Sequence, residues 1–131
     1  MTIETYLADL GTYLQTNSIG TIGTDIFYMG LDESMGNCIS LIPYGGIEPD
    51  NIVSGEANLC NPSVQVLVRN IAAATGLSKA TTIYKLLRIV SNQTIGTTKF
   101  LKIVPVSPPM FVAKTDGGYY LFSINLKILI Q

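Results

Sequence analysis

The segment Tyr119–Ile130 carries an apolar side chain at every second position. These positions are Tyr120, Phe122, Ile124, Leu126, Ile128 and Ile130, and the residues between them include Ser123, Asn125 and Lys127. A period of two places alternate side chains on opposite faces of a β-strand, so one face suits a core and the other a surface. A strand of this length needs neighbours to pair with. The chain is therefore predicted to fold around a β-sheet.

Five further segments are predicted to be extended. They are Asp25–Tyr28, Cys38–Tyr44, Val64–Arg69, Lys99–Val104 and Met110–Lys114. Asp116-Gly117-Gly118 supplies the turn residues of a hairpin between the last of them and the C-terminal strand. A polar turn joins Asp25–Tyr28 to Cys38–Tyr44, so we expect these two strands to form a first hairpin.

Two segments show the helical spacing of apolar residues. The stripe of the first consists of Ile3, Leu7, Leu10 and Leu14. Thr2 is its candidate N-cap, and the helix is expected to end at Asn17–Gly20. The second helix is predicted from about Thr75 to Ser91, followed by a turn-rich link over Gln93–Thr98. Its buried stripe is predicted to comprise Leu77, Ala80, Ile83, Tyr84, Leu87 and Val90.

The predicted order of elements is α-β-β-β-α-β-β-β. Strands that follow one another, rather than alternating with helices, are typical of the α+β class. We expect a largely antiparallel β-sheet with two amphipathic helices packed on one face. The sequence shows no internal repeat and no convincing domain boundary, so residues 1–131 are predicted to form one domain.

Between the second and third strands lies Gly45–Pro62, with the sequence GGIEPDNIVSGEANLCNP. Its glycine, proline, asparagine and aspartate residues predict an irregular loop. A loop of about eighteen residues exceeds the usual length of a connection, so it is either mobile or functional. Ile47, Ile52, Val53 and Leu59 are unusual in a segment that only faces solvent. We interpret it as an arm that contacts a partner, with a mobile surface loop as the alternative.

Charged residues make up 13% of the chain and apolar residues 47%. So few charges leave apolar surface that is either exposed or covered by other proteins, and we favour association. With a net charge of −1 and scattered basic residues, nucleic-acid binding is not expected. No run reaches the ~18 apolar residues of a membrane-spanning helix, and the first ten residues do not resemble a signal peptide.

The chain contains no histidine. Many nucleophilic and metal-dependent arrangements use one, and the acidic residues show no paired spacing. We therefore assign no catalytic residue, no metal ligand and no cofactor, and do not expect an enzyme. Gly20–Gly23 precedes a strand, whereas a phosphate-binding loop follows one. Cys38 and Cys60 are predicted to be reduced thiols, the first in a strand and the second in a loop.

Residues 20–46 read GTIGTDIFYMGLDESMGNCISLIPYGG. This stretch resembles the first hairpin of the tail-terminator, or minor capsid, proteins of long-tailed bacteriophages. In that family a helix precedes a GT-GTDIF-G-L segment, and an NCI-L--YGG strand follows it. The helix LADLGTYLQTNSIG, the Val64–Arg69 strand and the second helix follow in the same order, so the resemblance covers most of the first ninety residues. The turn Asp32-Glu33-Ser34-Met35 departs from it, because the family tends to have a proline there.

The resemblance implies a virion structural protein of the tail and neck, assembled in the host cytoplasm. Members of the family form a six-membered ring that caps the tail tube, ends its polymerisation and presents a surface to the neck proteins of the head. The implied partners are other copies of the chain, the tail-tube protein and a head–tail connector protein. The candidate contact residues are Met29, Leu31, Met35, Ile47, Ile52, Val53 and Leu59.

Two alternatives stay open. Another neck component, such as a head-completion or tail-completion protein, would differ from a tail terminator in the partner that it binds. A small α+β ligand-binding domain would require a deep polar pocket with convergent carboxylates. The architecture alone does not choose between these functions, because one fold can host many of them.

Overall fold

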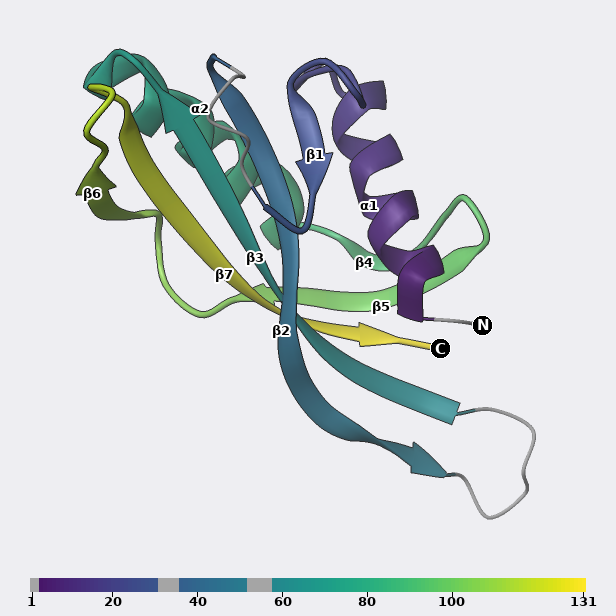
Figure 1. Cartoon of the computed structure of the whole chain (residues 1–131). Coiled ribbons are helices and arrows are strands. Elements are labelled where there is room, and N and C mark those ends of the chain that lie inside the picture. Colours follow the sequence, from purple (N-terminus) through teal and green to yellow (C-terminus); the bar gives the residue numbers. More distant parts are fainter. Residues whose placement is uncertain (1–2, 31–35, 52–57) are drawn as a thin grey trace.

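The computed structural model describes residues 3–30, 36–51 and 58–131 (Figure 1). Their helices and strands are α1 (Ile3–Thr16), β1 (Ile26–Tyr28), β2 (Cys38–Asn51), β3 (Asn58–Asn70), α2 (Ala73–Arg88), β4 (Ser91–Ile95), β5 (Thr98–Pro105), β6 (Met110–Lys114) and β7 (Tyr120–Ile130). The predicted α+β class is confirmed. The order differs by one strand, since four strands rather than three follow α2.

The strands form one mixed sheet in the order β1-β2-β3-β7-β5-β4. β3 lies along one side of β7. On the other side, β5 pairs with the stretch Leu126–Ile130 and β6 pairs with Tyr120–Ser123. The pairings are antiparallel except for that of β1 with β2. The sheet is therefore largely antiparallel, as predicted, with one parallel pair at its edge.

The predicted first hairpin is wrong, because β1 and β2 run parallel, with Ile26 opposite Ile39. The amide of Ile39 donates to the carbonyl oxygen of Asp25 at 2.7 Å, and the amide of Met29 donates to that of Leu41 at 3.0 Å. Met29 and Gly30 have φ angles of 66° and 149°, which turn the chain out of β1. A polar connection between two strands fits either direction of pairing, so sequence alone did not exclude a hairpin.

The strand β4 replaces the end of the second predicted helix and the link expected over Gln93–Thr98. α2 ends at Arg88, and Ser91–Ile95 pairs with β5 in an antiparallel hairpin. β4 is an edge strand in which Ile95 alone is buried, so its sequence shows no apolar alternation. This is the physical reason why the sequence pattern did not predict it.

Most of the predicted Gly45–Pro62 loop is β-strand. β2 continues to Asn51 and β3 begins at Asn58, with Gly46 opposite Pro62 and Asn51 opposite Asn58. The pairing of β2 with β3 is irregular at two places, with register shifts between Pro43 and Gly46 and between Ile47 and Asp50. Such shifts let a strand continue through glycine and proline residues that do not fit a regular ladder. We call residues 46–51 and 58–62 the arm. Its outer part extends past the end of β7 (Figure 1).

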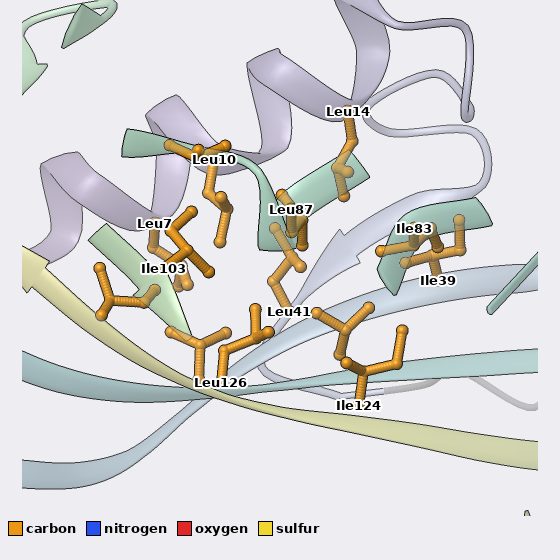
Figure 2. Close-up of a cluster of buried hydrophobic side chains, with 14 of the residues drawn as sticks. Leu7, Leu10, Leu14, Ile39, Leu41, Ile83, Leu87, Ile103, Ile124 and Leu126 are labelled. Atoms are coloured by element: carbon orange, nitrogen blue, oxygen red, sulfur yellow. The ribbon is translucent and has the colours of Figure 1, made fainter. Parts of the chain in front are cut away.

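Both helices pack on the same face of the sheet, and the core lies between them and the strands (Figure 2). α1 contributes Leu7, Leu10 and Leu14, and α2 contributes Ile83 and Leu87. The sheet contributes Ile39, Leu41, Ile103, Ile124 and Leu126. The apolar stripes of the two helices therefore meet the alternating apolar faces of the strands. The N-cap predicted at Thr2 lies outside the described residues.

The first turn of α2 differs from the prediction. Leu77 is 45% exposed, and the neighbouring Gly76 is buried in its place. A Cβ atom at Gly76 would lie 2.9 Å from Cε2 of Phe122 and 3.0 Å from Cβ of Asn70. The absence of a side chain thus lets α2 approach β7 closely, while Leu77 faces outward.

Candidate protein-contact surfaces

The strand β6 presents apolar side chains to solvent. All five of its residues are exposed, and the exposed fractions of Met110, Phe111 and Val112 are 44%, 59% and 50%. Val106, just after β5, is 55% exposed. Pro105, Pro108 and Pro109 have no amide hydrogen, so the ladder of β5 is interrupted before β6 resumes pairing with β7. An apolar strand is thereby held at the periphery of the sheet.

The hairpin between β6 and β7 fixes this surface in place. The amide of Thr115 donates to the carbonyl oxygen of Tyr119 at 2.7 Å, and Gly118 adopts a φ of 88°, which a turn residue with a Cβ atom rarely does. The predicted turn at Asp116-Gly117-Gly118 is thus confirmed. The Phe111 ring packs edge-on against Phe122, with 5.9 Å between centroids. These contacts fix the orientation of β6 relative to β7.

The sequence-predicted contact residues lie on two different parts of the fold. Met29 follows β1 and is 65% exposed. Ile47 and Leu59 lie on the arm, in β2 and β3, where Leu59 pairs with Asp50. Leu31, Met35, Ile52 and Val53 lie outside the described residues. The structure thus places Met29 beside β2 and the other two described candidates on the arm that extends from the sheet.

Arg69 fixes the start of β2 against the end of β3. Arg69 is only 5% exposed, its Nε donates to the carbonyl oxygen of Gly36 at 3.2 Å, and its guanidinium stacks over the Tyr119 ring at 5.1 Å. The adjacent Asn37 accepts a hydrogen bond from the amide of Ile71 at 2.9 Å. These contacts join residues 36–37 to β3 and to the β6–β7 hairpin, so we assign Arg69 a structural role.

Cys38 lacks the features of a reactive thiol. Cys38 and Cys60 are both free thiols; Cys38 is buried in β2 as predicted, and Cys60 lies in β3 rather than in a loop. Burial raises the pKa of the Cys38 thiol, while the nearby Arg69 acts in the opposite direction. A thiol whose pKa is raised carries little of the thiolate that nucleophilic chemistry requires. Cys38 is therefore a core residue.

Two depressions of the described surface include an acidic side chain. The described residues contain no group of three or more metal-binding side chains, and none of their helices is long and apolar enough to cross a membrane. The depressions that include an acidic side chain hold one carboxylate each, Asp116 beside Arg69 and Lys114, and Asp25 beside Cys38. Neither provides the convergent carboxylates that a ligand-binding domain of this type was expected to need.

Sequence reasoning located β6 with the correct bounds but did not identify it as a contact surface. The signal was available in Met110-Phe111-Val112, where three large apolar residues follow one another without alternation. A strand with one buried face alternates, so a continuous apolar run implies either a strand buried on both faces or an exposed apolar surface. The strand is short and follows two prolines, which fits an edge of the sheet and therefore the second case.

The described fold is a sheet covered by helices on one face, with an exposed apolar strand at its periphery. Exposed apolar surface of this kind is typical of protein contact sites. A solved chain described as "Virion of native gene transfer agent (GTA) particle" has a similar fold, with a TM-score of 0.70 and 9% identity over 95% of this chain and 92% of that chain. A comparison with curated proteins gave no match. The chain belongs to the bacteriophage tail terminator protein family, which matches residues 13–131. It is accordingly a structural protein of the phage tail and neck.

Proposed function

We propose that this protein caps the tail tube as a homomeric ring of six copies, ends polymerisation of the tube and provides the surface to which the head is joined. Its partners are then the tail-tube protein and a head–tail connector protein. The family match over residues 13–131 carries this proposal. The apolar edge at β6 and the extended arm support it, because both are surfaces that a ring could cover.

The mechanism would be complementary binding, with the whole chain acting as one domain. Polymerisation of a tube requires that each ring presents a surface on which the next one assembles. A different protein with one matching face and one non-matching face stops this addition. We propose that the sequence-predicted contact residues, Met29, Leu31, Met35, Ile47, Ile52, Val53 and Leu59, contribute to contacts with neighbouring copies or with the tube.

The test is electron microscopy of particles assembled after disruption of the gene. Overlong tail tubes without heads are the expected result, because growth would lack its terminator. Tails of normal length that do not join heads would instead assign the protein to another neck component, such as a head-completion protein. Normal infectious particles would contradict both functions.

A further inference from the structure

Two segments from the first and the last third of the sequence lie against the same buried cation. Residues 36–38 lead into β2 and are called the entry segment here, and residues 115–119 form the turn of the β6–β7 hairpin. The Nε of Arg69 donates to the carbonyl oxygen of Gly36 at 3.2 Å, and its guanidinium lies 5.1 Å from the centre of the Tyr119 ring. One side chain of β3 therefore bridges the entry segment and the hairpin.

A second route joins the same two segments. Ile71 follows β3 directly, and its amide donates to Oδ1 of Asn37 at 2.9 Å. A Cβ atom on Gly118 would lie 3.8 Å from Cδ1 of Ile71, so the Ile71 side chain reaches the hairpin turn. The chain that leaves β3 thus contacts the entry segment with its backbone and the hairpin with its side chain.

The position of the Tyr119 ring is set by the turn that carries it. The amide of Thr115 donates to the carbonyl oxygen of Tyr119 at 2.7 Å, and the amide of Tyr119 donates to Oγ1 of Thr115 at 3.1 Å. The amide of Gly118 donates to the carbonyl oxygen of Thr115 at 2.9 Å. Tyr119 is therefore held at both backbone groups, and its ring follows any movement of the hairpin.

Burial makes these contacts of Arg69 costly to lose. The residue is 5% exposed, and a buried charge is tolerated only where hydrogen bonds and nearby groups compensate for the lost water. A cation within about 6 Å of a ring centre is attracted to the ring, more strongly when the pair is shielded from water. A displaced Tyr119 ring would leave the guanidinium less well compensated. The guanidinium would then shift, and its hydrogen bond to Gly36 would weaken.

We infer that the β6–β7 hairpin and the entry segment open and close as one unit, with Arg69 as the residue that positions both. Parts of a fold commonly open at a lower free energy than the whole. No strand pairing of the described residues joins β6 to β2, so the sheet itself does not impose this link. A protein bound at β6 would then alter the entry segment, and the reverse would hold, because a coupling free energy acts in both directions.

The first experiment uses Cys38 as a reporter of the entry segment. Cys38 is 3% exposed and pairs with Arg69 in the sheet, so a thiol reagent reaches it only when this region opens. The rate of its labelling by dithionitrobenzoate is measured in the full chain carrying Cys60→Ser, under native conditions. Tyr119→Leu should raise this rate by about tenfold, whereas Tyr119→Phe keeps the ring and should leave it within about twofold.

Lys114→Met is the matched control. The Nζ of Lys114 lies 5.2 Å from the centre of the Tyr120 ring, so this variant removes a cation–ring contact from the same hairpin and leaves that of Arg69 with Tyr119 in place. The labelling rate of Cys38 should stay within about twofold of the parent. An equal rise in Tyr119→Leu and Lys114→Met, or no rise in Tyr119→Leu, would overturn the proposal.

The second experiment separates local opening from a general loss of stability. Hydrogen exchange of backbone amides, measured by mass spectrometry, is compared over residues 36–41, 115–119 and 64–68. The last range lies in β3, whose inward valines are fully buried, and it reports global unfolding. Arg69→Lys keeps the charge but lacks the planar group with its Nε donor. It should accelerate exchange in the first two ranges together and leave the third unchanged.

Faster exchange in only one of the first two ranges would contradict a common unit. Equal acceleration in all three ranges would mean that Arg69 acts on overall stability instead. Where Arg69→Lys does not fold, Tyr119→Leu tests the same expectation, because it leaves the buried cation in place. Both experiments use the purified chain, so neither result depends on whether the protein caps a tail tube.

Discussion

β4 and β6 are both five-residue strands with one paired edge, but they differ in what covers them. β4, with the sequence SNQTI, buries Ile95, and α1 packs against it and the neighbouring β5. β6, with the sequence MFVAK, has all five residues exposed. α1 therefore covers part of the polar edge, around Ile95, whereas β6 has no buried residue. Apolar residues on an open edge favour association, whereas polar residues tolerate contact with water.

The cover of β4 depends on the packing of α1, and the largest effect on stability is expected for Leu10→Ala. Leu10 is fully buried between α1 and the sheet. Removing it leaves a cavity and should lower the free energy of unfolding by about 2–5 kcal/mol. Urea denaturation measures this loss. Leu77→Ala on α2, where the side chain is 45% exposed, is the control and should cost less than about 1 kcal/mol. Equal losses of unfolding free energy in the two variants would mean that the packing of α1 on the sheet contributes no more to stability than an exposed side chain does.

Asp9→Ala tests the polar link between α1 and the β4–β5 turn. The Asp9 carboxylate accepts hydrogen bonds from Oγ1 of Thr98 at 2.6 Å and from the amide of Thr97 at 3.2 Å. Their loss should cost about 2 kcal/mol in urea denaturation, since hydrogen bonds to a charged group are stronger than neutral ones. Asp9→Asn keeps one acceptor oxygen and should cost less. Asp116→Ala, an exposed acid in the β6–β7 turn, is the matched control; an Asp9→Ala loss no larger than that of Asp116→Ala would remove this link from the comparison.

On the uncovered edge, Val112→Lys should separate association from stability. The Val112 side chain is 50% exposed, so the substitution should change the free energy of unfolding by no more than about 0.5 kcal/mol. Self-association, measured by sedimentation, should weaken by about tenfold, because the lysine would have to be desolvated in the contact. Asn92→Lys adds the same charge at an exposed position of β4 and should leave association unchanged; since the φ of Asn92 is 48°, which favours asparagine, this variant is a control for association only. Similar behaviour of the two variants would show that the edges are equivalent.

The smallest expected effect concerns Tyr6 on α1. Its hydroxyl is buried and has no hydrogen-bond partner in the described part of the chain. Tyr6→Phe should therefore stabilise the fold by up to about 1 kcal/mol at pH 7. A loss of stability of more than about 0.5 kcal/mol on this substitution would show that the hydroxyl is satisfied in solution.

The same residue gives a pH dependence. Burial raises the pKa of Tyr6 above its ordinary value of 10.0, so the unfolded chain releases this proton at a lower pH than the folded one. The folded state then binds more protons, and stability falls as the pH rises above about 10. Tyr6→Phe should make this fall less steep in urea denaturation at pH 9 to 11. Unchanged steepness would assign the fall to other groups, such as Tyr28, whose pKa is raised by burial and by Asp9.

The parts of the fold that sequence predicts well are those whose ends are marked by turn residues or by helix termini. Met110–Lys114 has the expected bounds, and the C-terminal strand and α1 lie within a residue or two of theirs, because turn residues or helix ends bound these segments. β4 has one buried residue, so it leaves no periodic signal. In the arm, two register shifts allow strand pairing through a segment rich in glycine and proline, which composition alone does not reveal.

The described candidate contact residues that sequence singled out do not include any residue of β6. Ile47 and Leu59 stood out because apolar residues are unexpected among loop residues, and they lie on the arm. In β6 the signal was weaker, because the apolar run Met110-Phe111-Val112 also fits a strand that is buried on both faces. Exposure of Phe111 depends on the absence of any strand or helix of the described chain beyond β6, which is a property of the tertiary arrangement. Parallel pairing of β1 with β2 is likewise set by the path of the chain rather than by local residue preferences.

The two register shifts in β2 have a geometric consequence. β-bulges bend the strand that carries them and increase its local twist, so the shifts at Pro43–Gly46 and Ile47–Asp50 help set the direction in which the arm leaves the sheet. If the arm contacts the next copy of the proposed ring, that direction helps set the rotation from one copy to the next. A closed ring of six needs about 60° per step, and a rotation that does not close gives an open filament. Copy number would then be encoded in a few backbone torsions of β2, and inserting or deleting a single residue there would change it.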